Sequence, residues 1–143
     1  MLFRKAMSSL ISASRYIVIY NRFMKNDSAY LRLMLDAFGM LREFTTGIDE
    51  QFFLKDRKTQ SAVIMQLEVI GQMAKKVSDE TRTEIDVPWK KMAGMRDWAA
   101  HDYFSLEIPR VWTTATTEAP EAEKIIRAYV DATFPLSSAG SES

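Results

Sequence analysis

The chain has 143 residues, a length that fits one domain with a substantial buried core. It contains no cysteine and a single histidine, which excludes a disulfide framework and a His/Cys metal cluster within one chain. Nineteen basic and 19 acidic residues give a net charge of zero, unlike a general nucleic-acid coat protein, and no apolar run approaches the roughly 20 residues that span a bilayer.

The first 25 residues contain five basic side chains and no acidic one, which is the composition of a targeting presequence. The simpler interpretation is a non-native extension, or a start codon assigned too early with Met24 as the true start. We therefore divide the chain into an N-terminal extension over residues 1–25, either disordered or misassigned, and a folded domain over residues 26–135.

A first helix is predicted over about residues 28–46. Apolar or small side chains recur there at steps of three and four: Leu31, Met34, Phe38, Leu41, Thr45 and Ile48. Asn26, Asp27 and Ser28 are candidate N-caps, and Gly47 is a candidate stop.

A second helix is predicted from its cap, Asp56, to about Ser78. Its apolar residues form two stripes, and a helix that is apolar over so much of its circumference belongs at the centre of a bundle. The stripes are Ile64, Leu67, Gly71 and Ala74, and Ala62, Met65, Val69 and Met73. Glu68 lies among them, and a buried carboxylate needs partners, so it is either a hydrogen-bond hub or a site residue.

Prolines mark the remaining helices. Pro88 suits the start of a third helix that ends near Ala100, and Pro109 and Pro120 each start another helix. The expected buried positions are Val111, Trp112, Ile125, Ile126 and Val130. Pro135 closes the last helix, and residues 136–143 form a disordered tail. No segment alternates as a strand does, so the predicted fold is an all-α, up-and-down bundle of four to five helices.

The only histidine, His101, lies in the segment from Gly94 to Phe104. Arg96 falls in an apolar stripe of that helix, where it must reach solvent, face a pocket or interface, or pair with an acid such as Glu68. His101 lies about 140° from Arg96 on an ideal helix, so either the helix ends near Ala100 or a second copy of the chain completes the site. Asp97, one turn before His101, is placed to fix its tautomer. By itself, one histidine beside an acid is more often structural than catalytic.

The spacing of Arg96, His101 and Tyr103 is the Arg-x4-His-x-Tyr motif, and in this context the chain resembles the HepT-type toxins of the HEPN superfamily. Flanking segments also fit that family in order. They are residues 30–37, 57–64, 67–71, 87–89, 94–97, 101–104 and 111–112. The resemblance covers roughly residues 27–130. It departs where the family often has glutamate and this chain has Gln72.

The resemblance implies a cytoplasmic, HEPN-like helical toxin that cuts RNA as a homodimer, without a metal or cofactor and without a membrane. It implies that Arg96 stabilises the scissile phosphate, that His101 is the general acid or base, and that Asp97 orients His101 or contacts the RNA. It also implies a partner, an MNT-type nucleotidyltransferase antitoxin that transfers AMP from ATP to Tyr103 in a type VII-like toxin–antitoxin system.

Two other interpretations remain open. In the first, the bundle is a non-catalytic partner module that docks a nucleotidyltransferase. The neutral charge favours this interpretation, and the motif disfavours it. In the second, the chain is a generic helical bundle in which His101 is structural and Tyr103 is a core or interface aromatic. Several other enzyme classes are set aside, because the sequence has no Gly-rich phosphate loop, nucleophile elbow, His-Glu-x-x-His motif or cysteine nucleophile.

Overall fold

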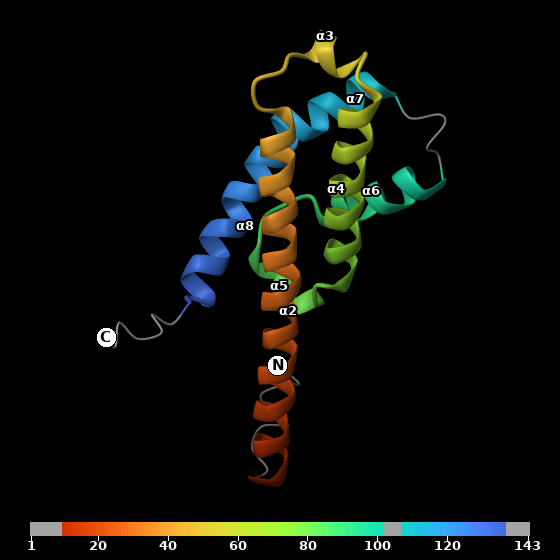
Figure 1. The fold of residues 1–143 in the computed structure, drawn as a ribbon. Coiled ribbons are helices and arrows are strands. Elements are labelled where there is room, and N and C mark those ends of the chain that lie inside the picture. The colour runs from red at the N-terminus through yellow and green to blue at the C-terminus, as the bar shows by residue number, and fades with distance from the viewer. Residues whose placement is uncertain (1–9, 102–106, 137–143) are drawn as a thin grey trace, which may run out of the picture.

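The structure, a computed structural model, describes residues 10–101 and 107–136. Over these residues it is helical and has no strand, which confirms the predicted all-α fold. The elements are α2 (Leu10–Thr45), α3 (Glu50–Phe53), α4 (Arg57–Lys76), α5 (Asp79–Glu84), α6 (Trp89–His101), α7 (Ile108–Thr113), the π-helix η2 (Thr114–Glu118) and α8 (Ala119–Thr133). The long helix α2 is flanked by α4 and α8, and α6 packs against α4 (Figure 1).

The core forms where α2, α4 and α8 meet. The predicted stripe of the first helix is buried at four positions, which are Leu31, Met34, Phe38 and Leu41. The first stripe of α4 is buried at all four positions, and Ile126 and Val130 of α8 belong to the same core. Burial of apolar side chains on facing helices is the main stabilising contribution in such a bundle.

The predicted start of the first helix is wrong. Helix α2 begins at Leu10 and runs through residues 26–28, because neither proline nor glycine interrupts residues 10–38. Asp27 is only 2% exposed and does not cap its own helix. Instead it accepts hydrogen bonds from the Ser78 backbone N–H at 3.0 Å and from the Thr81 hydroxyl at 2.6 Å. It therefore anchors the start of α5 across 51 residues of chain. The domain boundary at residue 26 stays a prediction.

The end of α2 agrees with the prediction. The helix stops at Thr45, and Gly47 follows with a φ of 81°. A side chain strains that left-handed conformation, so glycine is the residue that suits it.

Helix α4 keeps its predicted cap position at Asp56 and ends at Lys76. Its second apolar stripe is only partly buried. Met73 is buried, but Met65 is 63% exposed, so the prediction that α4 is covered on both stripes is wrong there. The reason is that α4 packs mainly against α2 and α6, which leaves the outer side of its first half to solvent.

The C-terminal helices form one continuous helical run from Ile108 to Thr133, with Pro109 in the first turn of α7. Pro120 lies in the first turn of α8, but α8 follows η2 directly, so Pro120 does not begin a separate helix. Proline has no backbone N–H, and the π-helical turn just before it ends the regular hydrogen-bond ladder at that point. Ile125, predicted to be buried, is 39% exposed.

Helix α8 is also tied to α5. The Tyr129 hydroxyl donates a hydrogen bond of 2.6 Å to a carboxylate oxygen of Glu84. Burial, followed by the contact with Glu84, raises the pKa of Tyr129 to about 12. The phenol therefore stays protonated at neutral pH and keeps donating to Glu84.

Candidate functional site

Helix α6 carries the motif, and its first turn is fixed to the segment before it. The Trp89 indole N–H lies 3.1 Å from the Arg82 carbonyl oxygen and 3.0 Å from that of Ile85. Met92, one turn later, is buried in the core. The indole bond and the buried methionine set the direction in which α6 leaves the bundle.

The contact between α4 and α6 centres on Gly71. A Cβ atom added to Gly71 would lie 2.6 Å from the Arg96 backbone nitrogen and 2.8 Å from the Met92 carbonyl oxygen. Both atoms belong to the backbone of α6 and cannot rotate away. Only glycine therefore allows this approach, and the approach places Arg96 directly over α4. The sequence placed Gly71 in a buried stripe but gave no sign that it touches the motif.

Arg96 is exposed, and among the described residues it forms no ion pair with Glu68 or any other acid. The Cβ atom of Arg96 lies against Gly71 and the residue as a whole is open to solvent. This agrees with the first of the three predicted possibilities, an arginine that reaches solvent. An exposed guanidinium on a fixed helix can bind a phosphate group of another molecule through its N–H donors. Glu68 is half-buried and does not act as the partner of Arg96.

Asp97 is held by α4. The Lys75 ammonium lies 2.8 Å from one carboxylate oxygen of Asp97 and 3.0 Å from the other. Lys75 is one helical turn after Gly71, so the same face of α4 contacts two consecutive residues of the motif, Arg96 and Asp97. The sequence alone does not show which of the chain's lysines contacts the motif.

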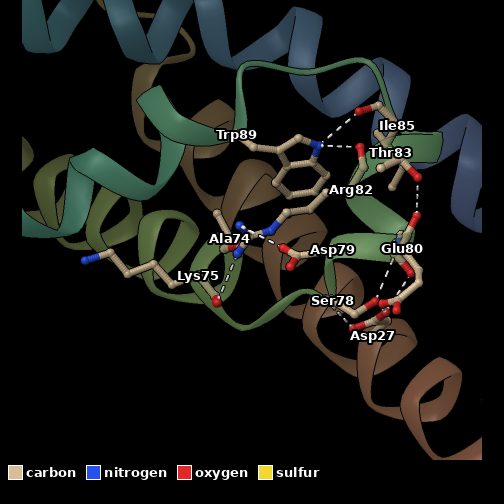
Figure 2. A network of polar contacts seen from close by, with 11 residues as sticks. Asp27, Ala74, Lys75, Ser78, Asp79, Glu80, Arg82, Thr83, Ile85 and Trp89 are labelled. Carbon is tan, nitrogen blue, oxygen red and sulfur yellow. Dashed lines mark hydrogen bonds and ion pairs between the residues drawn. The ribbon is translucent and has the colours of Figure 1, made fainter.

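The backbone of Lys75 is fixed from the other side by α5. Arg82 donates hydrogen bonds to the carbonyl oxygens of Ala74 at 2.7 Å and Lys75 at 3.0 Å, which satisfies acceptors at the C-terminal end of α4. Figure 2 shows this arrangement, with the Arg82 guanidinium against the two carbonyls and the Lys75 side chain extending away from it. The start of α5, with Ser78 bound to Asp27, lies in the same network.

The other two motif residues are described less fully. Helix α6 extends to His101, so positions 96 and 101 lie about 140° apart around one continuous helix. The side chain of His101 lies outside the described part of the structure, as does all of Tyr103. The roles predicted for these two residues stay predictions.

A cavity of about 350 Å³ lies beside α6 but does not include the motif. It is lined mainly by apolar side chains, among them Leu67, Met92 and Met95, and the Lys91–Glu118 ion pair of 2.7 Å lies at its edge. Arg96 and Asp97 are not part of its lining. The candidate site is therefore the crossing of α4 and α6 at Gly71, and not the cavity.

The described residues offer neither a cluster of metal ligands nor a membrane-spanning helix. No three or more His, Cys, Asp or Glu side chains gather there as metal ligands would. None of the helices in the described part of the chain is both long enough and apolar enough to cross a membrane.

Comparison with known proteins gives a consistent result. The model of the family described as ribonuclease HepT-like matches residues 34–129. A probable ribonuclease HepT from Thermococcus cleftensis is 39% identical over 92 residues, which is 64% of this chain and 84% of the relative. A protein of Caldanaerobacter subterraneus named as a candidate RNase is 37% identical over 105 residues, 73% of this chain and 94% of the relative.

A similar candidate RNase from Methanocaldococcus jannaschii is 37% identical over 97 residues, 67% of this chain and 84% of the relative. No solved structure matches the chain significantly. The family match covers α4, the Gly71 crossing and the whole motif, including the residues whose side chains are not described. The chain belongs to the ribonuclease HepT-like family.

Proposed function

We propose that this protein is a metal-independent endoribonuclease that works in the cytoplasm as a homodimer, and that it is the toxin of a type VII-like toxin–antitoxin system. The observation that carries the proposal is the exposed Arg96 on the motif helix, held over α4 at Gly71, in a chain of the ribonuclease HepT-like family. The names of its relatives, which describe them as RNases, support the same activity.

The chemistry fits the residues of the motif. RNA carries its own nucleophile, the 2′-hydroxyl, so cleavage needs a base to take its proton and an acid to protonate the leaving 5′-oxygen. Histidine is the side chain whose unperturbed pKa, about 6.5, suits proton transfer near neutral pH, and we assign this role to His101. Arg96 stabilises the negative charge that grows on the phosphoryl oxygens. Asp97 orients His101 or the RNA.

The count and placement of these groups support the proposed homodimer. One chain has one histidine, and its α6 carries positions 96 and 101 on different faces. A two-fold dimer brings two copies of each group to one interface, where Arg96 of one copy and His101 of the other act on the same phosphate.

The function is tested by incubating total RNA and transfer RNA with the purified protein in EDTA, with His101→Ala in parallel. We expect the wild type to cut RNA without a divalent metal and the variant to lose the activity, because the proton-transfer group is gone. Absence of cutting by unmodified wild-type protein would favour the module that docks a nucleotidyltransferase. Cutting by His101→Ala at the wild-type rate would remove His101 from the mechanism.

Tyr103 is the proposed point of control. An MNT-type nucleotidyltransferase transfers AMP from ATP to its hydroxyl: the phenolic oxygen attacks the α-phosphorus, pyrophosphate leaves and the phenolic proton passes to solvent. The new phosphate and adenosine add negative charge and bulk beside a site meant for RNA phosphate, which blocks it.

This step predicts a mass gain of one adenylate on Tyr103 after incubation with such an antitoxin and ATP, together with loss of RNA cleavage. Mass spectrometry of the digested protein locates the group. Tyr103→Phe should gain no mass and should keep cutting RNA in the presence of the antitoxin and ATP. An adenylate found on a different residue would contradict the assignment.

A further inference from the structure

Several basic residues lie on α4, α5 and α6, but most of them are engaged away from the motif. Lys76 lies with its ammonium 5.7 Å from the centre of the Tyr30 ring, and Arg82 is held at the C-terminal end of α4. Lys91 pairs with Glu118 at the edge of the apolar cavity. Among these residues, Lys75 is the one whose side chain contacts the motif, at a carboxylate oxygen of Asp97 2.8 Å away.

The fold fixes the backbones that carry the Lys75–Asp97 pair. Gly71 brings the backbones of α4 and α6 together at Arg96, and Arg82 binds the Lys75 carbonyl. Exposed ion pairs contribute little to stability, and the Asp97 side chain is 59% exposed. The pair therefore matters less for stability than for the charge that it holds next to Arg96.

If RNA is the substrate, the negative charge of Asp97 must be neutralised. Asp97 brings a negative charge next to Arg96, at the position where an RNA phosphate would approach, and like charges repel the phosphate. The Lys75 ammonium, bound to both carboxylate oxygens, offsets that charge. Lys75, Asp97 and Arg96 together then carry a net charge of +1.

We propose that Lys75 is a positioning residue of the RNA site, which neutralises Asp97 and fixes it against α4 so that the RNA phosphate meets Arg96 in a locally positive environment. This role rests on the proposed RNA cleavage. It adds Lys75, a residue of α4, to an RNA site whose other residues lie on α6. Lys75 acts through Asp97 and does not take part in proton transfer.

The test is binding of a single-stranded 2′-O-methyl RNA oligonucleotide, which lacks the nucleophile and so is not cut, measured by fluorescence anisotropy at low salt. Lys75→Met keeps most of the alkyl stem and removes the charge. We expect its Kd to rise about fivefold, the effect of one close charge in water. In cleavage assays KM should rise while kcat changes little, and Lys75→Arg should restore binding.

The decisive comparison is the double variant. Asp97→Asn added to Lys75→Met removes the carboxylate that Lys75 offsets, so RNA binding should return to the level of Asp97→Asn alone. Lys58→Met is the matched control, because Lys58 is an exposed lysine near the other end of α4, about 25 Å away at 1.5 Å per residue. It should bind RNA like the wild type.

The role of Lys75 would be overturned, with the proposed function left standing, by wild-type affinity in Lys75→Met or by a double variant that binds as weakly as Lys75→Met. Failure of the wild-type protein both to bind and to cut RNA would overturn the proposed function, and this role with it. A fall in affinity for Lys58→Met equal to that for Lys75→Met would show general charge attraction, and would also overturn the specific role.

Discussion

Gly71→Ala is expected to lower the free energy of unfolding by about 2 kcal/mol, within the range that overpacking of a tight core costs. The added methyl group would lie 2.6 Å from the Arg96 nitrogen and 2.8 Å from the Met92 carbonyl oxygen. Because these are backbone atoms, α6 must move away from α4 as a whole. The movement also shifts Arg96, so RNA cleavage should fall even under conditions where the variant is folded.

Gly94→Ala is the matched control. Gly94 lies on α6, two residues before Arg96, and a Cβ atom there meets nothing within 4 Å. Its replacement should raise stability by about 0.5–1 kcal/mol, because alanine favours the helix over glycine. Urea unfolding of the two variants measures the difference. Equal stability of Gly71→Ala and Gly94→Ala would contradict the close crossing of α4 and α6.

The sequence predicted those parts of the fold that depend on local periodicity. The buried stripe of α4, the stop at Gly47 and the extent of α6 follow from helical spacing and from residues that begin or end helices. The motif residues were also found from the sequence, through their spacing and the segments around them. The roles of His101 and Tyr103 stay predictions, since their side chains lie outside the described residues.

Contacts between distant segments could not be predicted in the same way. Asp27 stands in an Asn-Asp-Ser sequence that is typical of a helix start, yet its carboxylate binds Ser78 and Thr81 far along the chain. The contact between Lys75 and Asp97 depends on the crossing of two helices, which a single helical wheel does not contain. The short helices α3 and α5 were missed because they are too brief to show a periodic pattern.

Arg96→Ala is expected to reduce kcat for RNA cleavage by about 100- to 1000-fold, which is the loss typical when one group that stabilises the transition-state charge is removed. Stability should change by no more than about 0.5 kcal/mol, because the residue is exposed and forms no ion pair within the described part of the chain. Single-turnover cleavage of an RNA substrate, beside urea unfolding, separates the catalytic loss from any loss of fold.

The conservative variant distinguishes charge from geometry at this position. Arg96→Lys keeps the positive charge but loses the planar fork that can bind two phosphoryl oxygens at once, so it should recover only part of the rate. Arg57→Ala, an exposed arginine at the start of α4, should cut RNA like the wild type. A lysine variant with full activity would mean that Arg96 acts only as a point charge. An active Arg96→Ala would instead place phosphate stabilisation on other groups, and the crossing at Gly71 would then serve the fold alone.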